Sequence, residues 1–202
     1  MKNIATLLLL ASLTLVNIGS CVNNAQDESS FEEKPLPTKA ECTDFINFFV
    51  KEKVCSTGDS IIVSDRDYVE FAFTSEDSSR LLSKVSALSD KDIIFIKKQL
   101  SVDQSFRLSK ITFCPNAKIV SADSIIALKM KNSGSFWNLF HEKYGDGSLV
   151  QISKPVFSID RSFALVRYSK MRGELSGSGG LAVYERVDDK WVFKLLLNKW
   201  VA

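Results

Sequence analysis

Few residues in this chain can support acid–base or metal chemistry, and the histidine count sets the narrowest limit. His141 is the only histidine among 202 residues. The dipeptide His141-Glu142 begins like the pattern His-Glu-x-x-His, in which two histidines one helical turn apart hold zinc. Position 145 is a glycine, so the second metal ligand is missing. We therefore expect no metal site and no catalytic role at His141, and we place it on the polar face of a short helix.

The glycine-rich segment 173–179 is a second candidate, because glycine-rich loops can hold phosphates or present a nucleophile. Its Gly-Ser-Gly at 177–179 is not a nucleophile elbow, because that motif needs a glycine two positions before the serine and Ser176 stands there. A strand follows it where a dinucleotide-binding loop would open a helix. Asp160, Asp188 and Asp189 fall in predicted turns, which favour aspartate for backbone reasons. We therefore predict a wide, flexible hairpin connection at 173–179, no catalytic residues and no cofactor.

The first twenty residues have the layout of a secretory signal peptide. A positive start at Lys2 precedes the uncharged apolar run 4–16, and the small residues Gly19 and Ser20 follow. The apolar run is short, because spanning a bilayer takes about 20 residues. We favour a signal peptide over residues 1–20, and a single transmembrane anchor is the alternative.

The residues Ile18-Gly19-Ser20-Cys21 resemble the lipobox of bacterial lipoproteins, although leucine is commoner at the first of these positions. The resemblance implies that Cys21 receives a diacylglyceryl group, that signal peptidase II cuts before it, and that the new amine is acylated with a chain such as palmitate. Two or more acyl chains hold a protein stably on a membrane. We therefore expect a lipoprotein of the bacterial cell envelope, anchored with its domain outside the cytoplasm, and favour the outer membrane. An ordinary secreted cysteine after a conventional cleavage is the alternative.

Three cysteines remain once Cys21 is set aside, namely Cys42, Cys55 and Cys114. An exported protein meets an oxidising compartment, which permits a disulfide. Cys42 and Cys55 on one straight helix would lie about 20 Å apart, whereas the α-carbons of a disulfide lie within about 7 Å. A bridge between Cys55 and Cys114 is geometrically freer, and we predict it. Three buried thiols, or a zinc site that adds His141 but lacks closely spaced cysteines, are the alternatives.

Composition and charge limit the classes of protein to which this chain can belong. With 45% hydrophobic and 25% charged residues, the composition is that of an ordinary globular protein. Twenty-six basic and 24 acidic residues give a net charge of +2, which offers no argument for a nucleic-acid partner. Residues 21–38 are polar and contain two prolines, so we expect a flexible tether. Residues 39–202 are enough for a single domain.

Hydrophobic periodicity predicts helices in the first part of this domain. Thr38 and Glu41 form a capping box at the start of the first helix. Residues 68–74 are either a strand or an irregular buried segment. The predicted helices cover 39–53, 77–87, 90–100 and 134–144, and the predicted strands cover 60–63, 111–113 and 124–130.

The last fifty-five residues contain four β-rich runs, at 149–158, 163–170, 180–187 and 191–200. Short turns join them, which predicts an antiparallel meander. Apolar residues occupy both faces of the last strands, so the sheet must be covered on both sides or curve around a core. We predict an α+β fold with N-terminal helices packed on a C-terminal antiparallel, curved sheet of four or more strands. Simple alternation places Trp191, Phe193, Leu195 and Leu197 together on one face.

This C-terminal part resembles the ends of uncharacterised bacterial lipoproteins and secreted proteins of unknown function. The shared scheme comprises Val156-Phe157, Ala164-Leu165-Val166, the glycine-rich segment, Lys190-Trp191 and the closing Trp200. The short helix at 134–144 belongs to the same pattern. The resemblance implies a shared fold and no particular activity.

Together these features predict a membrane-anchored envelope protein that acts as a non-enzymatic binding or structural module. Its expected partners are the membrane, through lipidated Cys21, and an envelope protein, with no nucleic acid and no specified small ligand. One alternative is a cone-like α+β domain that binds a small ligand in a pocket and supports weak enzymatic chemistry. Another is an envelope immunity or inhibitor protein with a flat, charged patch.

Overall fold

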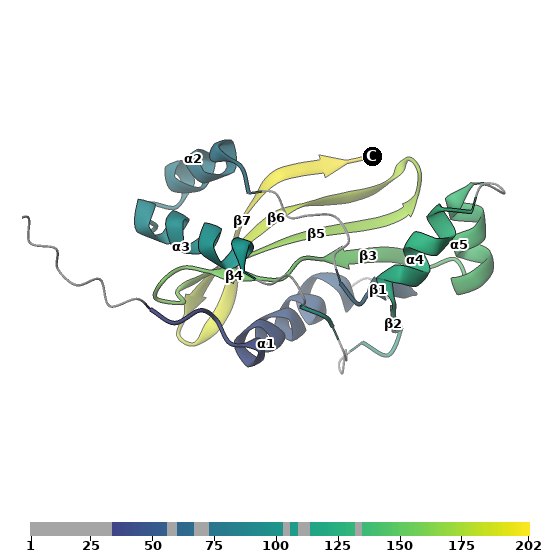
Figure 1. The fold of residues 1–202 in the computed structure, drawn as a ribbon, viewed down its shortest axis with the longest axis horizontal. Helices are drawn as coiled ribbons and strands as arrows, with labels where there is room; N and C mark the ends of the chain where they lie inside the picture. The colour runs from purple at the N-terminus through teal and green to yellow at the C-terminus, as the bar shows by residue number, and fades with distance from the viewer. Residues whose placement is uncertain (1–33, 56–59, 67–72, 103–105, 109–113, 132–134) are drawn as a thin grey trace, which may run out of the picture. The chain divides into compact units, whose positions relative to one another are not determined.

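The computed structural model describes residues 34–55, 60–66, 73–102, 106–108, 114–131 and 135–202 (Figure 1). These residues belong to one compact unit, Lys34–Ala202. The helices are α1 (Lys39–Phe49), its π-helical continuation η1 (Val50–Val54), α2 (Ser75–Lys84), α3 (Asp90–Ser101), α4 (Ala122–Lys129) and α5 (Phe136–Tyr144). The strands are β1 (Ile61–Ser64), β2 (Ala117–Val120), β3 (Ser148–Ile152), β4 (Val156–Phe157), β5 (Phe163–Gly173), β6 (Ser176–Val187) and β7 (Lys190–Val201).

The seven strands of the described residues join one mixed sheet, in the order β2-β1-β3-β5-β6-β7 with β4 paired to β5. The α+β class is confirmed, and the C-terminal strands β3 and β5 to β7 pair antiparallel as predicted. The sheet differs from the expected purely antiparallel one because β1 pairs parallel with both β2 and β3. Parallel neighbours require long crossover connections. The helices α2 and α3 lie between β1 and β2 in the chain, and α4 and α5 lie between β2 and β3.

Capping boxes begin three of the helices. In α1 the Thr38 side chain accepts a hydrogen bond from the backbone N–H of Glu41, whose carboxylate accepts one from the N–H of Thr38. The same reciprocal pair occurs at Thr74 and Asp77 before α2 and at Ser89 and Asp92 before α3. Each box satisfies backbone donors that the first helical turn leaves open. The predicted helices 39–53, 77–87, 90–100 and 134–144 are therefore confirmed as elements, with shifted ends.

The strand predicted at 124–130 is wrong, because these residues belong to helix α4. Ser121 accepts a hydrogen bond from the N–H of Asp123 and starts the helix. The buried residues Ala122, Ile125 and Leu128 recur at helical spacing, so tertiary packing overrides the strand preference of the paired isoleucines. The strand predicted at 111–113 and most of the segment 68–74 lie outside the described residues.

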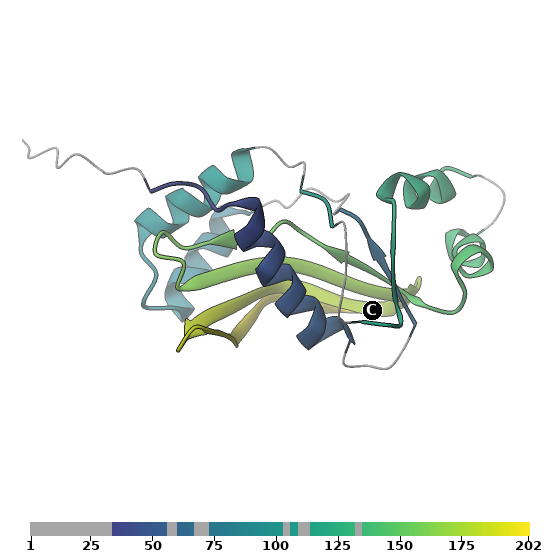
Figure 2. The same cartoon turned by 90° about the horizontal axis from the view of Figure 1, so that it is seen from below.

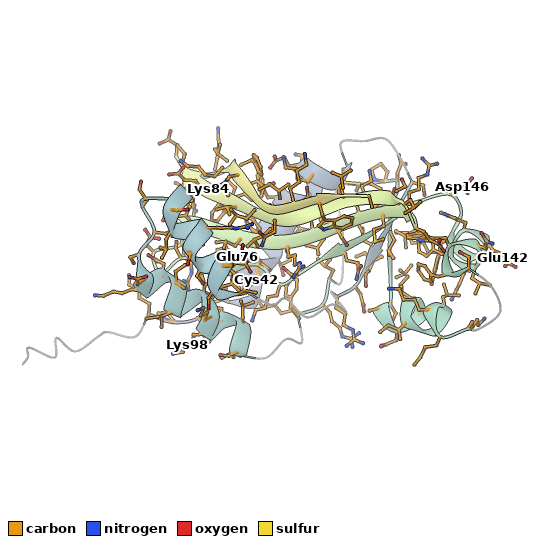
Figure 3. The ribbon with its side chains drawn as sticks, turned by 90° about the horizontal axis from the view of Figure 1, so that it is seen from above. Cys42, Glu76, Lys84, Lys98, Glu142 and Asp146 are labelled. Atoms are coloured by element: carbon orange, nitrogen blue, oxygen red, sulfur yellow. A yellow bond between two sulfur atoms is a disulfide. The ribbon has the colours of Figure 1, made fainter. Side chains whose placement is uncertain are left out.

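The sheet has two unlike faces. Helix α1 and η1 cross one face and form the largest core cluster with it (Figure 2). On the other face, α2 and α3 cover one end of the sheet and α4 and α5 cover the other end (Figures 1 and 3). The second face is therefore covered by two separate helix pairs.

A β-bulge in β7 changes which side chains share a face. Phe193 and Leu195 pair with consecutive residues of β6, so Lys194 is an extra residue in the ladder. An extra residue reverses the alternation beyond it. Trp191 consequently packs in the α1 core, whereas Leu195 and Leu197 pack in the α2–α3 core. The prediction that these residues share one face is wrong for that reason.

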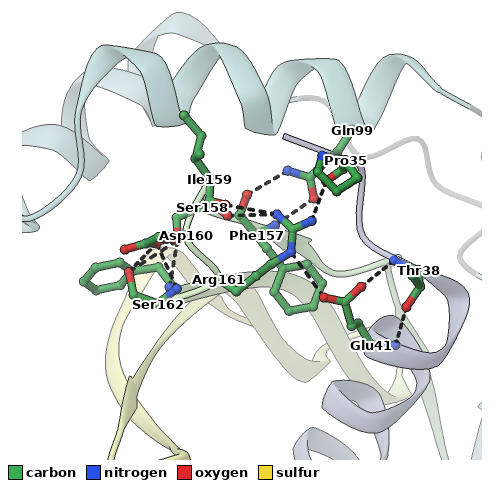
Figure 4. Close-up of polar contacts among 11 residues, drawn as sticks. Pro35, Thr38, Glu41, Gln99, Phe157, Ser158, Ile159, Asp160, Arg161 and Ser162 are labelled. Atoms are coloured by element: carbon green, nitrogen blue, oxygen red, sulfur yellow. Dashed lines mark hydrogen bonds and ion pairs between the residues drawn. The ribbon is translucent and has the colours of Figure 1, made fainter. Parts of the chain in front are cut away.

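Arg161 fastens the beginning of the domain to the turn between β4 and β5 (Figure 4). Its backbone φ is 64°. Its guanidinium donates to the carbonyl oxygen of Pro35 at 2.6 Å and to a carboxylate oxygen of Glu41 at 3.4 Å. It also donates to the carbonyl oxygen of Ser158 at 3.2 Å. The described end of the expected tether, residues 34–38, is thus held against the domain.

Tyr184 is the largest fully buried side chain on the α1 face. Edge-on contacts with Phe45, Phe48 and Phe193 hold its ring, with centroids 5.6 Å away in each case. Its hydroxyl oxygen is buried without a hydrogen-bond partner in the described part of the chain. Burial, and then the negative charge of Glu52, raises the pKa of this hydroxyl well above its ordinary value. The ring therefore contributes packing, and the hydroxyl, although it lies near the Glu52 carboxylate, makes no hydrogen bond of ordinary geometry among the described residues.

We expect Tyr184→Phe to leave the free energy of unfolding unchanged or to raise it by up to about 1 kcal/mol, since it removes an unpaired buried hydroxyl. Phe45→Ala, in the same cluster, should lower it by about 3–5 kcal/mol through cavity formation. Urea unfolding followed by circular dichroism measures both. A loss of more than about 1 kcal/mol in Tyr184→Phe would show that the hydroxyl has a partner in solution.

Candidate functional site

A polar stretch interrupts the second sheet face between its two helix pairs. Along β5, Phe163 and Leu165 belong to the α2–α3 core, and Met171 packs against the α4–α5 core. Arg167 and Ser169 lie between them on the same face, because alternate residues of a strand point the same way. A cavity of about 240 Å³ occupies this position. We call it the sheet groove.

The sheet groove draws its lining from four elements. These are helix α4 and strands β3, β5 and β7, which contribute Lys129, Gln151, Arg167, Tyr168, Ser169, Met171 and Trp200. Strand register explains the arrangement, since Gln151 pairs with Ser169 and Ser169 pairs with Gly179. Gly179 in turn pairs with Trp200. One transverse row across β3, β5, β6 and β7 therefore forms the floor.

The side-chain amide of Gln151 is the most unusual group in the sheet groove. The residue is only 7% exposed. Its Oε1 accepts a 3.4 Å hydrogen bond from the Ser169 hydroxyl, but its Nε2 has no partner among the described residues. A buried donor without an acceptor costs about 1–3 kcal/mol. The position therefore favours a ligand that brings an acceptor oxygen to Nε2.

Arg167 supplies a positive charge at the same place. It is half-buried, and within the described ranges its guanidinium makes no hydrogen bond or close ion pair. Its charge acts on Asp77 of α2. Burial acts to raise the pKa of Asp77, but hydrogen bonds from Thr74 and Asn198, and then the charge of Arg167, outweigh it and lower that pKa. Asp77 is therefore an anion beside Arg167.

Both carboxylate oxygens of Asp77 already accept hydrogen bonds from other residues. Thr74 donates to Oδ2 from its backbone N–H at 2.8 Å and from its hydroxyl at 2.9 Å. Asn198 donates its side-chain amide to Oδ1. Asp77 thus balances part of the charge of Arg167 at a distance, while the guanidinium N–H groups stay available to a ligand.

Trp200 forms an apolar wall of the sheet groove by lying on two glycines of β6. A Cβ atom at Gly179 would lie 2.8 Å from Nε1 of Trp200 and 2.5 Å from the carbonyl oxygen of Tyr168. A Cβ atom at Gly177 would lie 3.3 Å from the same indole. Only glycine lets the ring approach the strand so closely.

The wide connection predicted at 173–179 is therefore wrong. Gly173 pairs with Ser176, so the turn consists of Glu174 and Leu175 alone. The glycines from 177 onward belong to strand β6, where they admit the indole ring of Trp200. Their role is close packing. In the sequence alone, a run of glycines in a closely packed strand looks the same as a run of glycines in a loop.

We expect Gly179→Ala to lower the free energy of unfolding by about 1–3 kcal/mol, because the new methyl group overpacks against Trp200 and strand β5. Gly173→Ala is the matched control, since its Cβ would meet only Ser176 at 3.9 Å. That control should change stability by less than about 0.5 kcal/mol. Equal effects of the two substitutions in chemical unfolding would contradict this packing.

The cysteines separate into a bridge and a buried thiol. Cys55 and Cys114 form a disulfide with α-carbons 5.5 Å apart, which is the pairing expected from the sequence. Cys42 is a free, buried cysteine on α1, in the interior of the domain (Figure 3). Burial raises the pKa of its thiol, so little of the nucleophilic thiolate forms at neutral pH. Cys21 lies outside the described residues.

His141 connects α5 to the end of β5 and does not face the sheet groove. Its Nδ1 lies 3.1 Å from the carbonyl oxygen of Gly145 and its Nε2 lies 3.0 Å from that of Arg172. The ring stacks on Trp137 at 5.7 Å. His141 is half-buried in these contacts, whereas the sequence placed it on a polar face. In the part of the chain that the structure describes, no three metal-ligating side chains come together.

The sequence analysis did not predict the residues of the sheet groove, because they belong to no catalytic motif. The pattern that could have indicated them is a polar residue at an inward-facing position of an apolar strand. Gln151 interrupts the buried strand β3, and Arg167 and Ser169 interrupt the buried face of β5. Nothing local links them to Trp200, which is more than thirty residues farther along the chain.

Comparison with known proteins adds no relative. No protein-family model, no curated protein and no solved structure matches this chain. Among the residues that the structure describes, no helix is long and apolar enough to cross a membrane.

Proposed function

We propose that this protein is a small-ligand-binding module held at the bacterial cell envelope by a lipid on Cys21. The observation that carries the binding function is the Gln151 amide, buried in the sheet groove with an unpaired Nε2. Most buried polar groups in folded proteins are hydrogen-bonded. An exception inside a cavity, beside an arginine with available N–H groups, supports a binding site.

The anchor rests on the N-terminal sequence. The apolar run 4–16 and the lipobox-like residues 18–21 support export and lipidation of Cys21. The compact unit begins at Lys34. Thirteen residues, 21–33, precede it, and a chain of that length spans at most about 45 Å when extended. The proposed lipid would therefore keep the domain within a short distance of the membrane.

Replacing Gln151 tests whether its amide stabilises the fold. We expect Gln151→Leu to leave the free energy of unfolding unchanged or to raise it by about 1–3 kcal/mol, because it removes a buried donor without an acceptor. Urea unfolding of the purified protein measures the change.

Gln99→Leu is the matched control. Gln99 is 2% exposed, and its amide is fully used, donating to the carbonyl oxygen of Phe157 at 2.7 Å and accepting from the N–H of Phe157 at 2.9 Å. Its replacement should lower the free energy of unfolding by about 1–3 kcal/mol. If Gln151→Leu lowers the free energy of unfolding as much as Gln99→Leu does, the Gln151 amide is structural and the binding proposal loses its support.

The anchor has its own test, mass spectrometry of the protein extracted in mild detergent from its membranes. We expect the mass of residues 21–202 plus three acyl chains, and we expect Cys21→Ser to lose the lipid and the membrane association. Cys42→Ser is the control and should retain both. An unlipidated wild-type protein that begins at another residue would overturn the anchor while leaving the ligand-binding proposal open to its own test.

A further inference from the structure

We infer that the ligand of the sheet groove is a small organic carboxylate with one flat apolar ring. This inference rests on the proposed ligand-binding function and specifies the chemical class that the sheet groove selects.

The polar lining of the sheet groove consists mainly of donors. The amide Nε2 of Gln151 and the guanidinium of Arg167 both lack partners among the described residues, and Lys129 adds a second positive charge nearby. No aspartate or glutamate occurs among the described lining residues. Asp77, an acidic group that interacts electrostatically with Arg167, has both oxygens hydrogen-bonded, to Thr74 and Asn198. A negatively charged ligand would complete this set.

The number and kind of donors favour a carboxylate. The planar fork of an arginine matches the two oxygens of a carboxylate. Phosphate sites commonly add several backbone N–H groups from a glycine-rich loop or a helix N-terminus. The floor of the sheet groove offers no such group, because Ser169 lies on β5, between β3 and β6, where both neighbouring strands pair with it. One arginine fork and one amide donor therefore suit a monoanion with two oxygens.

The apolar half of the sheet groove lies next to these donors. Trp200 covers Gly179, whose neighbour across the sheet is Ser169, and the next residue in that row is Gln151. Adjacent strands lie about 4.8 Å apart, so about 10 Å separates the backbone beneath the indole from the backbone of Gln151. A flat ring packed on Trp200 would thus place an attached carboxylate near Gln151 and Arg167. Aromatic pairs add stabilisation beyond buried area.

The volume limits the ligand further. The cavity measures about 240 Å³, which suits a small ligand. Drug-sized ligands occupy larger pockets, of about 300–1,000 Å³. A single ring that bears a short carboxylate fits a cavity of this size.

Titration calorimetry with ring compounds of matched shape tests the inference on the unaltered protein. The probes are benzoate, phenylacetate, neutral benzamide and cationic benzylamine, with inorganic phosphate, glucose and adenosine as other classes. We expect a carboxylate to bind at least tenfold more tightly than benzamide, and benzylamine and phosphate not to bind. Arg167→Gln should weaken carboxylate binding at least tenfold.

Arg172→Gln is the matched control, because it removes the same charge from the same strand at an exposed residue that does not line the sheet groove. Its carboxylate affinity should stay within twofold of the parent, and unfolding curves of both variants show whether each is folded. Equal loss in both variants would mean that the effect is general electrostatics, and would overturn the inference.

The remaining outcomes distinguish the inference from the proposed function. One outcome is that glucose, adenosine or benzamide binds, that Gln151→Leu abolishes this binding, and that the carboxylates do not bind. The ligand class is then wrong and the binding function stands. If phosphate binds as tightly as the carboxylates, selection is for charge alone and the ligand class is again wrong. If no probe binds, both the ligand class and the proposed function are contradicted.

Discussion

A sheet that is apolar on both faces must be buried on both faces, and the rest of this structure follows from how the chain meets that constraint. The face packed against α1 and η1 is covered by one continuous helical segment. The opposite face is covered by short helices, α2 and α3 at one end and α4 and α5 at the other. Because neither pair reaches the middle of the sheet, the strands there carry polar residues, and the sheet groove lies at that position.

Strand pairing gives the sheet groove its rigidity. The floor residues belong to one transverse row, so the positions of Gln151, Ser169 and Trp200 are fixed by backbone hydrogen bonds across four strands. Sites built on paired strands hold their geometry more precisely than sites on loops. Two glycines of β6 complete the row by allowing the indole to lie against the strand. The unpaired Gln151 amide thus projects from a backbone position that strand pairing fixes.

Much of the fold could be predicted from local signals. Three capping boxes mark the starts of α1, α2 and α3, and alternating apolar runs mark the C-terminal strands. Two local patterns gave wrong predictions. The isoleucine pair of α4 has strand preference but packs at helical spacing. The glycines of β6 have the composition of a loop but serve an aromatic contact. In both places a partner distant in the sequence decided the outcome.

By itself the sequence determined the α+β class, the start of α1 and the turns at Asp160 and at Asp188–Asp189, because these depend on residues only a few positions apart. It also predicts export and lipidation of Cys21, from the apolar run 4–16 and the lipobox-like residues 18–21. Only the tertiary structure decided that β1 and β2 join the sheet in parallel, that Lys194 reverses the faces of β7, and that Gln151, Arg167 and Trp200 share one groove. These features depend on register between distant strands, which no local pattern specifies.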